Sequence, residues 1–340
     1  MNQDLRDLLK QAGVSDAHAE DLWARAVMIH VRGLLPPIAR SSTRAAEAGF
    51  HLLLLDQQGK VARRVKCRGS DDQGFRRECD ALVALGSDPR ASQFVLQVST
   101  ASSEHLRVHV SDYLGSESYA DLIDDQNAPA WQETAEEILA IVHLLGERAK
   151  RAMPRLLPVR EDVDLLSELG HRFAFLEEGR IEKATLDVLR EVLRETSVPR
   201  HPQHGDLWPG NLIRGKDGRW LVIDFERFGE IQFPLYDAFH LIWSSMQGTR
   251  SSDLPATRSQ AWHTACCNLL NGAADRHGLS GQQFGALALS FILEATAYRM
   301  RPGIPSSYSE DLRTILHRSA QRMEAGLDMS TLARECLFWT

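Results

Sequence analysis

The sequence has few cysteines and no long apolar run, and each shortage excludes a class of protein. Its five cysteines are irregularly spaced and include no C-x-x-C pair, which argues against a disulfide framework, a zinc ribbon or a thioredoxin-type site. The longest apolar stretches, such as residues 52–55 and 286–293, are far too short to span a bilayer. Residues 1–11 lack the apolar core of a signal peptide. We therefore expect a soluble cytoplasmic protein with reduced thiols and no membrane partner.

Basic charge and glycine-rich motifs are also scarce. The 39 lysine and arginine residues are outnumbered by 46 aspartate and glutamate residues, which gives a net charge of -7 and argues against a nucleic-acid partner. Neither G-x-G-x-x-G nor the G-x-x-x-x-G-K-[ST] motif occurs, so a glycine-rich phosphate loop is excluded. The remaining composition, 43% hydrophobic and 25% charged over 340 residues, is that of one large or two modest globular domains.

The apolar spacing changes along the chain. Residues 3–32 predict one or two amphipathic helices, and the region up to about 114 is typical of strands interrupted by one helix. We expect two strands within residues 51–67 joined at Gln57-Gln58-Gly59, a helix over Phe75–Leu85, and strands near Gln93–Val98 and Leu106–Tyr113.

Nearly everything after residue 130 has helical spacing. The sequence therefore predicts an N-terminal helical extension over 1–33, a strand-rich lobe over 34–114 and a helical lobe over 115–340. A cleft between two such lobes is a common place for a ligand.

One polar island interrupts the helical part. It reads HGDLWPGN over residues 204–211 and continues to an apolar run that ends at Asp224. Asp206 and Asn211 flank a Pro-Gly turn and can face one site, while Asp224 projects beyond the end of a strand. Two carboxylates and one amide oxygen form a hard ligand set that suits Mg²⁺ together with a phosphate.

The order H-x-D-x-x-x-x-N followed by an apolar-Asp pair is similar to the catalytic and metal loops of the protein-kinase-like superfamily. That superfamily also needs a strand lysine for the nucleotide phosphates and a helix glutamate that pairs with the lysine. Lys66 ends an expected strand, and Glu78 lies in the expected helix that follows it. Their order, element types and separation all agree with this interpretation.

The sequences of three segments resemble motifs of the aminoglycoside phosphotransferase / choline kinase group of small-molecule kinases. These segments are HGDLWPGN, the IDFE that contains Asp224, and the PLYD that ends at Asp237, within a resemblance over about 34–245. The resemblance implies an α+β, bilobal protein-kinase-like fold, with an N-lobe of about five antiparallel strands and a mainly helical C-lobe. It implies that Asp206 is the catalytic base and that Asn211 and Asp224 hold Mg²⁺.

The same resemblance assigns the nucleotide contacts. Lys66 would position the phosphates of ATP or GTP, and Glu78 would orient Lys66. The backbone of an inter-lobe hinge around Ser111, Asp112 and Tyr113 would hydrogen-bond adenine. The turn that covers the phosphates would fall near Ser41-Ser42-Thr43, where hydroxyls and amides would replace the family's glycine.

Neighbouring residues have supporting or open roles. The resemblance implies that Asp237 braces the catalytic loop from the helix that follows. Glu226 is open between a second metal contact, a substrate amine and a solvated charge. His201 and His204 form an H-x-x-H pair, but a zinc site needs a third ligand and none is near in sequence. We therefore interpret His204 as a structural residue of the loop.

We predict an ATP- or GTP-dependent, Mg²⁺-dependent phosphotransferase that acts on a hydroxyl of a small molecule. Aminoglycosides, amino alcohols and sugar-like acceptors all stay open, as does the oligomeric state. A catalytically silent kinase-like binding module is one alternative, favoured by the missing glycine turn. An atypical protein kinase is the other, and the absence of HRD, DFG and APE motifs argues against it.

Overall fold

The computed structural model describes residues 3–14, 27–29, 50–55, 60–114, 118–122, 127–153, 161–178, 181–194, 196–215, 217–248, 256–300 and 307–324. The chain forms two compact units. The sheet unit comprises residues 1–119, 148–154 and 211–228, and the helical unit comprises residues 120–147, 155–210 and 229–340. In the ranges described, each helix is too short or too polar to cross a lipid bilayer.

Five antiparallel strands in the order β1-β2-β3-β5-β4 form the base of the sheet unit. Their bounds are Val27–Ile29 (β1), Phe50–Leu55 (β2), Val61–Gly69 (β3), Val98–Ser102 (β4) and Leu106–Asp112 (β5). The expected strand pair within 51–67 is confirmed by β2 and β3, and the last expected strand by β5. The helix α3 (Gln73–Gly86) confirms the expected helix, and the Asp72 carboxylate caps it by accepting the Phe75 N–H at 2.9 Å.

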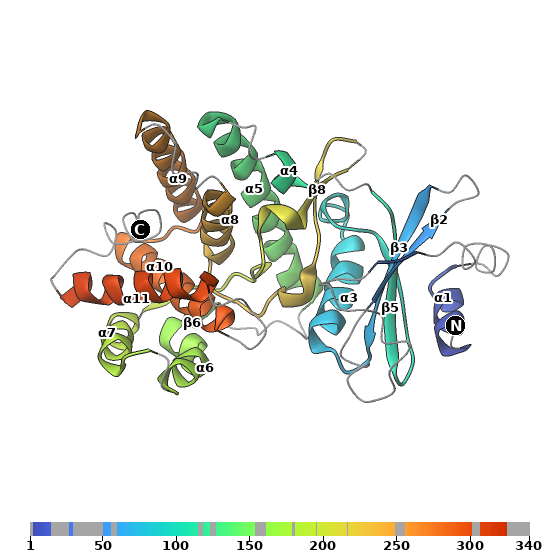
Figure 1. Ribbon diagram of the computed structural model, residues 1–340, viewed down its shortest axis with the longest axis horizontal. Helices are drawn as coiled ribbons and strands as arrows, with labels where there is room; N and C mark the ends of the chain where they lie inside the picture. Colours follow the sequence, from blue (N-terminus) through green and yellow to red (C-terminus); the bar gives the residue numbers. More distant parts are fainter. Residues whose placement is uncertain are drawn as a thin grey trace. The chain divides into compact units, whose positions relative to one another are not determined.

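Strand alternation gives the two faces of this sheet different tasks. Val65 and Cys67 of β3 lie in an apolar cluster with Leu8 and other residues of the helix α1 (Gln3–Gln11). Lys66, between them, points to the opposite face, which α3 covers through Glu78. Figure 1 shows α1 and α3 on opposite sides of the sheet. One face therefore forms a core, and the other presents charge.

Two expected elements near the sheet are wrong. The predicted strand over 93–98 is a single 3-10 turn, η2 (Ser92–Phe94), and the strand begins only at Val98. The Asp88 carboxylate accepts the backbone N–H groups of residues 90 and 91, so a local side-chain bond stabilises a turn there. Residues 27–29, expected to be helical, form β1, because pairing with β2 overrides their helical spacing.

A short hairpin completes the sheet unit. The strands β8 (Leu212–Arg214) and β9 (Trp220–Val222) pair antiparallel between the 3-10 turns η4 (Pro209–Asn211) and η5 (Phe225–Arg227). The turn η5 packs on α3. A late part of the sequence is thereby placed beside the sheet formed by its beginning.

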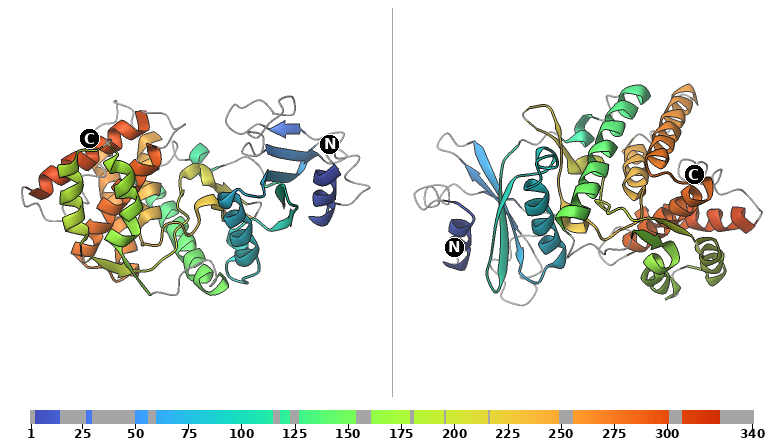
Figure 2. Two further views of the ribbon diagram at one scale, coloured as in Figure 1. Left: turned by 90° about the horizontal axis from the view of Figure 1, so that it is seen from below. Right: turned by 180° about the vertical axis from the view of Figure 1, so that it is seen from behind.

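The helical unit confirms the expected helical character of the chain after residue 130. Its elements are α4 (Tyr119–Leu122), α5 (Ala128–Ala152), β6 (Asp162–Asp164), α6 (Leu165–Glu177), α7 (Lys183–Leu193), β7 (Ser197–Pro199), α8 (Tyr236–Gly248), α9 (Ala256–Arg276), α10 (Gly281–Arg299) and α11 (Ser307–Glu324). The first residue of α4 and the part of α5 from residue 148 belong to the sheet unit. The helix α10 contacts α6, α7, α8 and α11, and both views of Figure 2 show the orange-red helices beside the yellow-green ones. Every residue of α10 from Phe284 to Ala297 is buried, which is typical of a helix at the centre of a core.

Candidate functional site

The candidate site in the sheet unit is centred on Lys66. Its ammonium lies 2.5 Å from the Glu78 carboxylate, and both side chains are buried. The register of β3 and β5 places His109 opposite Lys66, and the His109 Nε2 atom lies 3.8 Å from Glu78. Phe75 of α3 also contacts this pair, and the Lys66 ammonium lies 5.6 Å from the centre of its ring. The strand lysine and helix glutamate expected as partners therefore meet.

Two more carboxylates reach the same ammonium from beyond β9. The Lys66 Nζ atom lies 3.3 Å from Asp224 Oδ1 and 2.8 Å from Glu226 Oε1. The left-handed backbone of Asp224 (φ 64°) turns the chain sharply at the strand end, a conformation that aspartate tolerates better than most residues. Arg77 fixes the turn by donating to the Glu226 carbonyl oxygen at 2.7 Å.

The charges of this cluster stabilise one another. Burial alone lowers the pKa of Lys66, but attraction by Glu78, Asp224 and Glu226 outweighs burial and raises this pKa above its ordinary value. Burial acts to raise the pKa of Glu78, yet Lys66 and His109 outweigh it and lower this pKa. Three carboxylates thus surround one ammonium.

The β8-β9 hairpin brings Asn211 to the end at which Asp224 lies. Leu212 pairs with Val222, so the residues just outside this pair meet at the open end of the hairpin. The Asn211 carbonyl oxygen accepts the Ile223 N–H at 3.0 Å, and the Asn211 side chain is buried. Both expected metal ligands therefore lie at one end of one hairpin.

The donor set next to Lys66 fits a hard divalent cation. Oxygen atoms of Glu78, Asp224 and Glu226 lie within 4.8 Å of one another, and the Asp224 and Glu226 side chains are 41% and 34% exposed. Carboxylate oxygens with access to water are the ligands that Mg²⁺ prefers, together with phosphate oxygens. Three carboxylates face the single ammonium of Lys66, and the excess negative charge favours binding of such a cation.

The segment HGDLWPG, residues 204–210, lies in the helical unit and is held by Asp237. The Asp237 carboxylate, at the start of α8, accepts the backbone N–H groups of His204 at 2.6 Å and Gly205 at 2.9 Å. Gly205 has φ 81°, a conformation that favours glycine. Asp206 follows directly and is half-buried, and its carbonyl oxygen accepts the Trp208 N–H at 3.0 Å. The backbone on the N-terminal side of Asp206 is therefore fixed.

Gln203 also supports this loop, and sequence reasoning missed it. Its side-chain oxygen accepts the Asp237 N–H at 3.0 Å, and its amide nitrogen donates to the His201 carbonyl oxygen at 3.1 Å. No motif marks Gln203. His109 was missed as well, although strand alternation with Lys66 in the paired strand was a signal for it.

The expected hinge lies at the end of β5. Ser111 is paired with both neighbouring strands, and its buried Oγ atom has no hydrogen-bond partner among the described residues. Asp112 is exposed, 3.8 Å from the Nε atom of Arg63. The Tyr113 N–H donates to the Ala62 carbonyl oxygen at 2.9 Å. The expected phosphate turn at Ser41 and Ser42 falls outside the described residues.

Comparison with known proteins decides the class of this site. The sequence profile described as "Phosphotransferase enzyme family" (APH) matches residues 53–276, about two thirds of the chain. The chain belongs to this family. The matched range includes both Lys66 and the loop at residues 204–211. The prediction of a small-molecule phosphotransferase is thereby confirmed. No curated protein sequence matches the chain.

Two solved structures share the fold of this phosphotransferase. One is a thermostable mutant of aminoglycoside phosphotransferase APH(4)-Ia in a ternary complex with ADP and hygromycin B: 14% identity, TM-score 0.54, covering 96% of this chain and 100% of that one. The other is choline kinase from Cryptosporidium parvum: 9% identity, TM-score 0.55, covering 95% of each chain. At these identities the likeness concerns the fold, and it confirms the expected α+β protein-kinase-like class.

Proposed function

We propose that this phosphotransferase uses ATP with Mg²⁺ to phosphorylate a hydroxyl group of a cationic small molecule. The observation that carries the proposal is the buried Lys66-Glu78 pair with Asp224 and Glu226 around the same ammonium. The Lys66 ammonium stays charged among these carboxylates. When a metal cation binds to the carboxylates, the ammonium can instead contact the nucleotide phosphates.

The nucleotide roles follow the residue order of the family. Lys66 contacts the phosphates and Glu78 orients it, while the backbone of residues 111–113 contacts adenine. The buried Ser111 hydroxyl, which has no hydrogen-bond partner among the described residues, lies on the strand next to that of Lys66 and supports a polar ligand there. We assign the phosphate-covering turn to Ser41 and Ser42. In this proposal residues 34–114 serve the nucleotide and residues 115–340 supply the metal and catalytic loops.

The metal ligands proposed are Asn211 and Asp224, with Glu226 on the same side because it already faces Lys66. Bound there, Mg²⁺ would neutralise phosphate charge. Its ligands come from one hairpin, so their separation is set by strand pairing and not by a flexible loop.

Asp206 is the proposed general base. Its carboxylate accepts the proton of the acceptor hydroxyl while that oxygen forms a bond to the γ-phosphorus. The bond between the γ-phosphorus and the β,γ-bridging oxygen breaks, and ADP leaves with the bonding electrons. Asp237 and Gly205 fix the backbone that precedes Asp206, so positioning supplies much of the rate enhancement.

The acceptor class is proposed from charge and from the two similar structures. Those structures are named for aminoglycoside and choline substrates, and both are cations that carry hydroxyl groups. The net charge of -7 favours a cation over an anionic acceptor.

The test combines nucleotide binding with phosphoryl transfer. Thermal shift with ATP or GTP, with and without Mg²⁺, should give a Mg²⁺-dependent stabilisation that Asp224→Asn abolishes. Asp206→Asn should retain this stabilisation yet lose about 10²–10⁴-fold in turnover on an acceptor found among aminoglycosides and amino alcohols.

Asp217→Asn is the matched control, because Asp217 is an exposed acid in the same hairpin. It should behave as wild type in both assays. Wild-type turnover in Asp206→Asn would refute the base assignment, and equal Mg²⁺-ATP binding by Asp224→Asn and Asp217→Asn would refute the metal assignment.

A further inference from the structure

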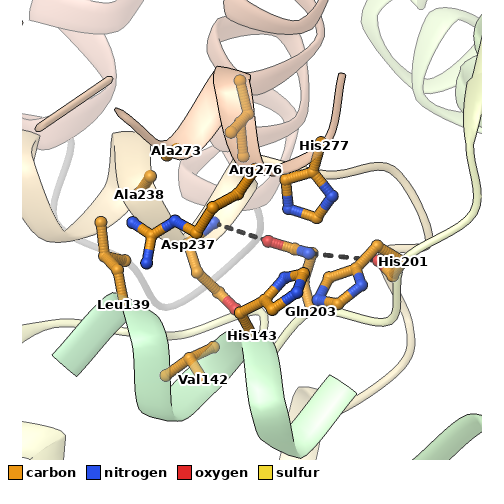
Figure 3. Close-up of a pocket in the computed structure, with 11 residues that line it drawn as sticks. Leu139, Val142, His143, His201, Gln203, Asp237, Ala238, Ala273, Arg276 and His277 are labelled. Atoms are coloured by element: carbon orange, nitrogen blue, oxygen red, sulfur yellow. Dashed lines mark hydrogen bonds between the residues drawn. The ribbon is translucent and has the colours of Figure 1, made fainter. Parts of the chain in front are cut away.

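Three histidines from distant parts of the sequence meet in the helical unit. His143 lies on α5, His201 follows β7 and His277 follows α9. One ring nitrogen of each lies within 4.8 Å of the others, and Figure 3 shows the three imidazoles turned toward one another. The H-x-x-H pair noted in the sequence thus supplies one member, His201, while His204 is not part of the cluster.

The three rings pack closely. The His143 and His201 rings are stacked with centroids 4.8 Å apart. The His277 ring makes a T-shaped contact with each, with centroids 4.9 Å from that of His143 and 4.8 Å from that of His201. His201 is buried, and the other two are half-buried. Imidazole nitrogens converging from three backbone segments are the ligand type that zinc and other late first-row metals prefer over magnesium.

The surroundings of His201 are those of a metal ligand. The Glu147 Oε1 atom lies 3.2 Å from His201 Nδ1, so the carboxylate can accept an Nδ1 proton and leave Nε2 as the donor atom. Gly146 makes this placement possible, because a Cβ atom there would lie 2.6 Å from His201 Nε2. The His201 ring therefore requires glycine, which has no side chain, at position 146.

The pocket beside the rings has the size of an ion site. It has about 30 Å³ of room for water-sized groups, which admits one or two waters and no organic ligand of drug size. Arg276 also lines it, but Figure 3 places the guanidinium across the Gln203 amide from the imidazoles.

We infer that His143, His201 and His277 bind one zinc ion, with water as a fourth ligand. Tetrahedral zinc with Zn–N bonds of about 2.0–2.1 Å holds its nitrogens roughly 3.3 Å apart. The ring nitrogens now lie within 4.8 Å of one another, so zinc binding requires the stacked His143 and His201 rings to rotate and draw closer. The ion would tie α5, the segment after β7 and the end of α9 together.

The site is connected to the catalytic loop. The His201 carbonyl oxygen accepts from Gln203, Gln203 accepts from the Asp237 N–H, and Asp237 holds the amides of His204 and Gly205. Zinc bound there therefore stabilises the support of the loop. Its role is that of a positioning site.

The experiment is zinc titration of the metal-free protein in competition with a chromophoric chelator, without nucleotide. We expect one equivalent to bind and to raise the Tm. Cobalt(II) should give visible d–d bands of a tetrahedral nitrogen site without a thiolate charge-transfer band. His143→Gln and His277→Gln should each bind zinc at least tenfold more weakly, and Glu147→Gln should lose about 10–100-fold in affinity.

His263→Ala is the control, because His263 lies on α9 outside the cluster, and its Nε2 atom lies 3.6 Å from the Cys267 sulfur, a pair that could hold zinc in place of the three histidines. It should bind zinc as wild type does. The inference is overturned if the wild type binds no zinc, if the His143 and His277 variants bind it unchanged, or if His263→Ala removes the binding. The wild-type cobalt spectrum distinguishes tetrahedral nitrogen ligation from thiolate ligation even where a variant folds poorly.

Discussion

Replacing Lys66 by methionine removes the ammonium from among three carboxylates while keeping an unbranched side chain. Glu78 is 3% exposed, so its charge would lie buried without its 2.5 Å partner. Removing one member of a buried ion pair costs about 3–5 kcal/mol. Asp224 and Glu226 are partly solvated and add little to this figure. We expect Lys66→Met to lose about 3–5 kcal/mol of unfolding free energy at pH 7.

The pH dependence of this loss has a definite sign. In the wild type the pKa of Glu78 is lowered, so its contribution is complete above the unfolded value of about 4.3 and is lost as pH falls through the folded value. In Lys66→Met, burial without the ammonium raises the pKa of Glu78 above the unfolded value. The variant then gains stability as Glu78 takes up a proton. The difference between the two proteins should therefore shrink from pH 7 to pH 5.

Urea unfolding followed by circular dichroism at both pH values, without nucleotide, measures this difference. The double variant Lys66→Met/Glu78→Leu removes both charges and should regain most of the lost stability. A loss below about 1 kcal/mol at pH 7, far under the cost of a broken buried pair, would refute the reasoning. An equal loss at pH 5 and pH 7 would refute the part that concerns Glu78.

Three further predictions concern the helical unit. Asp237→Asn leaves a loop amide facing a side-chain NH₂ group and should cost about 1–3 kcal/mol; an unchanged urea midpoint would contradict the bracing role of Asp237. Gly205→Ala places a Cβ atom at φ 81° and should cost about 1–2 kcal/mol, seen as a lower Tm, whereas an equal or higher Tm would argue against strain there. Glu294→Gln leaves the Arg172 guanidinium without its charged partner and should cost about 3 kcal/mol in urea unfolding, and a loss within error would mean that solvent already screens the pair.

The sequence predicted the part of the site that depends on local rules. Strand and helix patterns placed Lys66 on a strand and Glu78 on the following helix, and the resemblance to the kinase-like superfamily supplied their pairing. The approach of Glu226 to Lys66 depends on the left-handed turn at Asp224, which no local pattern specifies. The strand expected near residue 95 was wrong because residues 92–94 form a 3-10 turn, directly after a turn that the Asp88 side chain holds.

The histidine cluster was beyond sequence reasoning for a different reason. His143 and His277 are separated from His201 by long stretches of chain. Only the packing of α5 and α9 around the segment after β7 brings them together. Motif spacing detects ligands that share a loop or a helix turn, and these three share neither.

The division of the chain between the two units has a consequence for synthesis on the ribosome. The sheet unit takes its last segment from residues 211–228, which is completed roughly 110 residues after its N-terminal segment ends at residue 119. At about 5–20 residues per second, the emerging sheet waits several seconds for the hairpin that carries Asp224. During that interval Lys66 and Glu78 have each other but lack Asp224 and Glu226. A fragment that stops at residue 114 would remain in this incomplete state permanently, and neither unit can be cut out of the gene as one continuous piece.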